Sequence, residues 1–182
     1  MSGFDFLFSF QSLLLGLAVA RVATGFADMW RGRKDMVVGI SPILLGLLIL
    51  FSAAQQWMLF WEARSVWTMG PWPILVSIGL ALPYVFVSQA MLPREQNTWA
   101  SLEDYYMAHS RVLVGALLLP PVISLSYNFA QGNAFGFSYA HIATVFVVRL
   151  GVPVLLICWQ QRLVHRLGLA ALTVTRIVGL FT

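Results

Sequence analysis

The stretch FDFLFSFQSLLLGLAVARVATGFADMW, residues 4–30, decides the fold. It is apolar for nearly its whole length, and a helix of about 20 such residues is long enough to cross the hydrocarbon core of a bilayer. Arg21 nevertheless lies deep inside the stretch, and Asp28 lies near its end. Because a charge in hydrocarbon costs free energy, an arginine at that depth points to a specific structural or functional requirement.

The rest of the chain shares this apolar character. Of its 182 residues, 59% are hydrophobic and only 10% are charged, whereas soluble domains carry about 25% charged residues. We therefore expect an all-α, polytopic integral membrane bundle that forms a single domain, residues 1–182, in a lipid bilayer. The Lys and Arg residues are scattered, so no nucleic-acid partner is expected. A single cysteine, Cys158, leaves no disulfide within the chain and no multi-cysteine metal site.

Polar or Gly/Pro-containing connections divide the chain into six apolar segments. The predicted transmembrane helices cover residues 4–30, 37–61, 72–92, 112–128, 138–159 and 167–181. Because the last segment is short and contains Arg176, five spans followed by an interfacial C-terminal helix are the alternative.

The basic residues predict the orientation of these spans. Most of the Lys and Arg residues fall in connections 31–36, 94–111 and 160–166. Cytoplasmic loops collect Lys and Arg. We therefore expect these connections in the cytoplasm, both termini on the other side, and the chain in a bacterial inner membrane.

Three arginines fall inside the predicted spans, and no carboxylate is expected at their depth. They are Arg21, Arg149 and, near the end of the last segment, Arg176. On the more lenient insertion scale a central arginine costs about 2.5–3.5 kcal/mol. Gln55 and Gln56, carbonyl groups freed near Pro153, water or a bound anion are the expected partners of the arginines.

Two interpretations of these arginines remain open. In the first, they extend to lipid phosphates or bond backbone carbonyls, and they fix the packing of the helices. In the second, they line an aqueous cavity that attracts an anion, because basic groups suit anion pores.

The connection before the fourth span has a pattern of its own. Ser101 and Asp104 in SLED resemble a capping box, which predicts a short interfacial helix leading into the span. Glu103 and Asp104 are expected to be solvated there. His109 and His165 fall at one predicted depth, so they are weak candidates for holding haem between two helices.

The expected function is non-enzymatic. The sequence has no HExxH, GxSxG or Walker A motif, and no metal site or cofactor is expected, with haem or a pigment as the exception to be tested. We expect a channel or carrier with a basic interior, acting on an anion or protons and assembling as a homo-oligomer or with partner membrane subunits. An accessory subunit of a respiratory or photosynthetic membrane complex is one alternative, and a haem-binding membrane redox protein is another.

Overall fold

The computed structural model describes residues 3–32, 36–65, 70–93, 98–130, 132 and 143–181. Within these residues all regular elements are helices, and one isolated bridge joins Val37 and Ser101. The predicted all-α class is confirmed for this part of the chain. In chain order the elements are α1 (Gly3–Gly32), α2 (Ser41–Glu62), η1 (Ala63–Ser65), α3 (Pro71–Ala90), α4 (Leu102–Leu117), α5 (Leu119–Ala130), η3 (Val145–Gly151), α7 (Val152–Cys158) and α8 (Arg162–Val178).

Four of the described helical segments are long and apolar enough to cross a membrane. They are Gly3–Gly32, Ser41–Ser65, Pro71–Ala90 and Leu102–Ala130. The helix α8 has 17 residues and is therefore about 25 Å long, which is shorter than the hydrocarbon core of about 30 Å. Residues 138–142 of the predicted fifth span lie outside the described residues. The number of spans and their orientation stay predictions.

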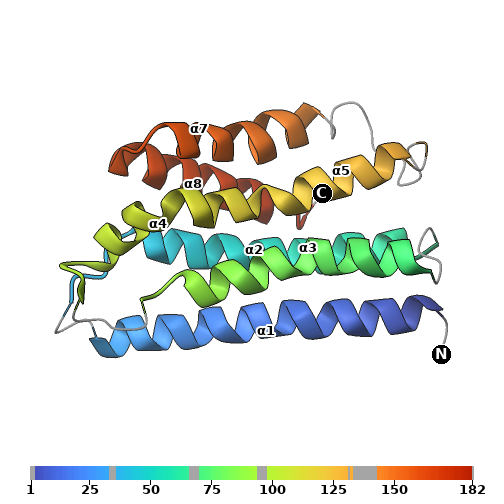
Figure 1. Cartoon of the computed structure of the whole chain (residues 1–182), viewed down its shortest axis with the longest axis horizontal. Coiled ribbons are helices and arrows are strands. Elements are labelled where there is room, and N and C mark those ends of the chain that lie inside the picture. Colours follow the sequence, from blue (N-terminus) through green and yellow to red (C-terminus); the bar gives the residue numbers. More distant parts are fainter. Residues whose placement is uncertain are drawn as a thin grey trace.

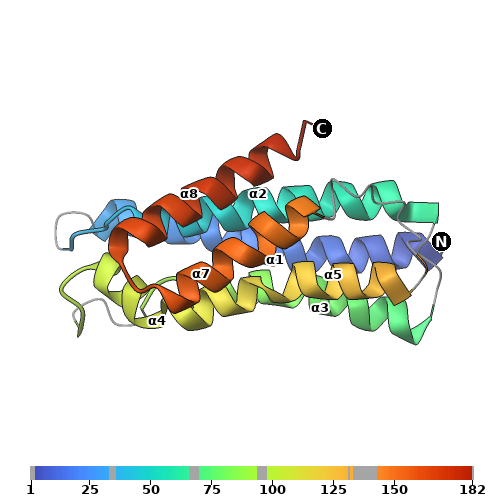
Figure 2. The same ribbon diagram turned by 90° about the horizontal axis from the view of Figure 1, so that it is seen from above.

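The helices run roughly parallel to one long axis and pack in layers (Figure 1). On one side α1 packs against α2 and α3, and on the other side α8 packs along α2 while α7 packs against α4. Seen from above, α7 and α8 form a hairpin, and α8 extends beside α2 (Figure 2). The apolar core lies between these layers and contains Leu15, Val22, Ile49, Ala81 and Leu169, all at most 1% exposed.

Charged side chains gather where α1 ends, α4 begins and α7 turns into α8. We call this the basic end; it carries Arg31, Arg162 and Arg166. The amide of Leu102 donates to the carbonyl of Val37, which ties the α1–α2 connection to the start of α4. Residues 33–35 and 94–97 of the predicted cytoplasmic connections lie outside the described residues.

The predicted N-cap at Ser101 is present. Its hydroxyl oxygen accepts a hydrogen bond from the amide of Asp104 at 3.1 Å, as expected for a capping residue. The helix that it starts continues without a polar break into the apolar segment, so residues 102–111 are helical. The expectation that Glu103 is solvated is wrong, because its side chain is only 4% exposed.

Candidate functional site

Two of the three predicted arginines meet at one glutamine. Nη2 of Arg149 donates to Oε1 of Gln55 at 3.1 Å, and Nη1 of Arg176 donates to the same oxygen at 2.9 Å. Gln55 comes from α2, Arg176 from α8 and Arg149 from η3. Three segments that are far apart in the sequence therefore build the Arg149–Gln55–Arg176 cluster.

Arg149 lies in an unusual helical segment just before Pro153. Proline cannot donate a backbone hydrogen bond, so Pro153 leaves the carbonyl of Arg149, four residues earlier, without its usual helical donor. The segment before Pro153 is a π-helix, Val145–Gly151, and π-turns often occur at functional sites. The sequence thus places a widened helical turn at the residue that carries the charge.

A glycine makes room for the glutamine. Gly179 follows the last turn of α8, and a Cβ atom there would collide with Nε2 of Gln55. The side chain of Gln55 is only 3% exposed, so its amide cannot move aside into solvent. Any larger residue at position 179 would therefore displace the acceptor that both arginines share.

The cluster contains two positive charges and no negative charge. Arg149 interacts electrostatically with Arg176, which repels it, and with Tyr84 on α3, which is 2% exposed. The Nε atoms of both arginines are buried and have no hydrogen-bond partner among the described residues. Arg176 lies in the last turn of α8, where the helix dipole offers only about half a negative charge. Two positive charges therefore face one neutral acceptor.

Arg21 and Gln56, the other two predicted site residues, do not join this cluster. Arg21 is on α1, which packs against α2 and α3 on the side away from α8 (Figure 1). Its Nε atom is also buried and has no partner in the described part of the chain. Gln56 is half-buried on another face of α2, because successive helical residues are turned by about 100°.

A second polar cluster lies at the basic end and was not predicted. Glu103 accepts hydrogen bonds from the amide and hydroxyl of Ser41, at 3.0 and 2.7 Å, and from Nε of Arg166 at 3.1 Å. These contacts join the starts of α2, α4 and α8. Beside them, Arg162 pairs with Asp104 at 2.6 Å, although the Arg162 side chain is 60% exposed.

The connection before α2 is shaped around Glu103. Gly39 has a φ of +76°, and a Cβ atom there would collide with the Glu103 carboxylate. Only glycine adopts such a φ at little cost. Gly39 is therefore the sequence signal that this carboxylate is enclosed rather than solvated.

The two histidines have different partners. Nδ1 of His165 lies 2.8 Å from the hydroxyl of Tyr106 in the core, whereas Nδ1 of His109 lies 2.9 Å from the carbonyl of Tyr105. The ring of His109 also contacts Trp99 and Tyr105. No described contact directs both rings at one shared ligand, and haem binding stays an untested alternative.

The surroundings of His165 favour a neutral ring. Burial lowers its pKa below the usual value of 6.5, although the backbone of Leu156 and Trp159 and the charge of Glu103 favour protonation. Nε2 of His165 makes no well-oriented hydrogen bond within the described residues. Protonating this ring therefore costs more in the folded chain than in water.

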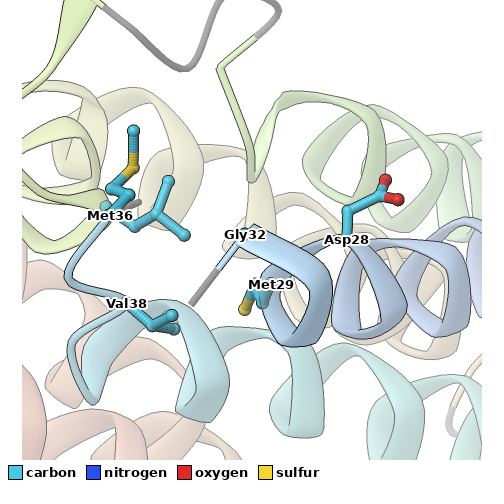
Figure 3. A pocket seen from close by; sticks show the side chains of 6 residues that line it. Asp28, Met29, Gly32, Met36 and Val38 are labelled. Carbon is cyan, nitrogen blue, oxygen red and sulfur yellow. The ribbon is translucent and has the colours of Figure 1, made fainter. Parts of the chain in front are cut away.

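Two hollows lie near the end of α1. A cavity of about 10 Å³ lies beside Met29, Met36 and Val38, with Asp28 extending from the helix nearby (Figure 3); it has room for about one water molecule. An open groove of about 360 Å³ lies between α1 and α2. Its lining residues are Phe26, Met29, Trp30, Val38, Ile43 and Leu47. Such a lining suits lipid chains rather than a polar substrate.

The comparisons with known proteins provide no further guide to function. No family model, no curated protein and no solved structure matches this chain. Among the described residues, no group of three or more His, Cys, Asp or Glu side chains is placed to hold a metal ion. The chemistry of the Arg149–Gln55–Arg176 cluster is therefore the best guide to the function of this chain.

Proposed function

We propose that this chain is a small integral membrane protein that binds and moves an anion, as a channel or a carrier. The observation that carries the proposal is the pair Arg149 and Arg176 on the single oxygen of Gln55. Two half-buried guanidinium groups share one neutral acceptor, and each has a buried Nε atom without a partner in the described part of the chain, so the cluster favours a negatively charged ligand. Arg21 would add positive potential from α1.

The depth of the cluster supports transport rather than surface binding. Gln55 is 14 residues after the start of α2 at Ser41, which is about 21 Å along the helix. Because the hydrocarbon core is about 30 Å thick, a site at this depth lies within it. An anion held there would be part of the way across the membrane. Assembly as a homo-oligomer, or with partner subunits, stays a prediction.

Flux measurements in liposomes test the proposal. Removing one unit charge about 4 Å from an anion costs about 4 kcal/mol at an effective dielectric constant of about 20, so Arg149→Leu should lower anion flux at least about tenfold. Arg111→Leu is the matched control, because Arg111 is exposed on α4. Unchanged flux in a folded Arg149→Leu protein, checked by circular dichroism and gel filtration, contradicts the proposal.

A further inference from the structure

We propose that the Arg149–Gln55–Arg176 cluster selects an oxyanion of the carboxylate, nitrate or phosphate type over a halide. This selectivity rests on the proposed function, because it names the class of anion that the same site takes. It follows from which nitrogen atoms of the guanidinium groups are used and which are not.

The donor pattern at Arg149 fits two acceptor atoms. Nη2 already donates to Gln55, while Nε, on the same edge of the guanidinium group, is buried and without a partner. The N–H groups on one edge of a guanidinium are parallel and match two oxygens of one oxyanion. A halide accepts both N–H groups at one atom, which bends the two hydrogen bonds inward, whereas two oxygens of an oxyanion accept them in line.

Arg176 adds donors from a second direction. Its Nη1 approaches Gln55 from α8, and its Nε is also buried and unpartnered within the described residues. The free Nε of Arg176 lies on the edge shared with Nη2 rather than Nη1, so a ligand that met both arginines would accept from donors that point in different directions. Oxyanions supply two to four oxygens around one centre, so one ligand can meet both arginines.

The glutamine oxygen marks the place of one ligand oxygen. Oε1 of Gln55 accepts from both arginines, as a carboxylate or phosphate oxygen would. It carries no full charge, so it leaves the two positive charges uncompensated. An oxyanion that bound beside it would supply both the negative charge and the additional acceptors.

Binding measurements on purified protein in zwitterionic nanodiscs test this selectivity directly. Sodium nitrate, phosphate, acetate and chloride are titrated at equal ionic strength, with affinity read by calorimetry. Because an oxyanion accepts these charge-assisted hydrogen bonds with better geometry, at least one oxyanion should bind about tenfold more tightly than chloride. Chloride binding as tight as that of every oxyanion overturns the selectivity.

The double variant Arg149→Lys with Arg176→Lys separates shape from charge. It keeps both positive charges but loses the parallel donors, so chloride affinity should persist while the preference for oxyanions disappears. The exposed Arg111→Lys variant should keep the preference. A double variant that retains the preference also overturns the inference.

The proposed function and the selectivity fail in different ways. Equal affinity for chloride and the oxyanions, with flux still lost in Arg149→Leu, leaves anion transport standing and removes the selectivity alone. No binding of any of the four anions to the wild-type protein overturns both. The wild-type titration needs no variant, so it decides the matter even where the lysine variants fail to fold.

Discussion

Replacing Gln55 by glutamate would place a carboxylate where the two arginines already converge. The substitution keeps the size and shape of the side chain, which is held between Gly179 and the guanidinium groups. Both hydrogen bonds already have a charged donor, and a carboxylate would add attraction between opposite charges, about 4 kcal/mol for each pair at about 4 Å and an effective dielectric constant of about 20. Gln55→Glu should therefore stabilise the folded chain by about 2 kcal/mol after the cost of burying the carboxylate.

The repulsion between the two arginines also predicts that Gln55→Glu stabilises the folded chain. Both donor nitrogens contact one oxygen, at 3.1 and 2.9 Å, so they are at most about 6 Å apart. Two like charges at about 6 Å repel by about 3 kcal/mol at an effective dielectric constant of about 20. A carboxylate between them relieves this repulsion.

Gln55→Glu should also weaken anion binding, because the new carboxylate neutralises the arginines and repels the anion. A negative charge about 4 Å from a bound anion costs about 4 kcal/mol at the same dielectric constant, which predicts an affinity loss of about a hundredfold or more. Denaturant unfolding in detergent and anion titration measure the two effects. Gln56→Glu is the matched control and should neither stabilise the chain nor weaken binding. A less stable Gln55→Glu protein refutes the assigned geometry.

Three further predictions concern the basic end. Glu103→Gln should lower the free energy of unfolding by about 3 kcal/mol, because the buried site then lacks the negative charge that pairs with Arg166. Asp104→Asn should cost under about 1 kcal/mol, because its ion pair is exposed. Denaturant unfolding of the two variants compares these costs. Gly39→Ala should lower the free energy of unfolding by more than about 2 kcal/mol, because of backbone strain and collision with Glu103. Gly16→Ala has open space around it and should raise the free energy of unfolding by up to about 1 kcal/mol. Thermal unfolding in detergent shows whether the two variants change stability in opposite directions. Since burial lowers the pKa of His165, the unfolded chain binds the proton more readily than the folded chain. The free energy of unfolding should therefore fall as the pH drops below about 6.5. His165→Gln should reduce this dependence on pH in unfolding curves measured from pH 7.5 to 5.5.

Apolar patterning accounts for most of what could be predicted about the fold. Long runs of apolar residues favour helices that satisfy their own backbone groups in lipid, and the described segments follow those runs closely. The start of α4 at Leu102 was also predictable, because Ser101 and Asp104 form a local capping pattern. The division of the last part into η3, α7 and a short α8 was less visible, since it depends on Pro153 and on packing.

The candidate site was partly predictable for a different reason. A deep arginine without a carboxylate needs an acceptor, and Gln55 and Gln56 were the polar groups available. Which of the two faces the arginines depends on how α2 is rotated about its own axis, and the sequence composition does not specify that rotation. Arg21 was grouped with the other arginines by depth, but its helix packs on the opposite side of α2.

The Glu103 cluster was missed because its partners are distant in the sequence. Arg166 is 63 residues away and Ser41 is 62 residues away, so no local pattern connects them. A charged residue in a short polar segment is usually exposed. Gly39 was the available signal, but its meaning depends on a φ angle that the sequence does not state.

Arg149 lies in a π-helical segment before Pro153, so the direction of its side chain depends on how many residues that segment contains. Each residue added to or removed from a helix rotates everything on one side of the change by about 100°. Deleting Gly151, between Arg149 and Pro153, would therefore swing the guanidinium group away from Gln55 while leaving the composition of the span almost unchanged. A deletion here would therefore disturb the cluster without removing any of its three side chains.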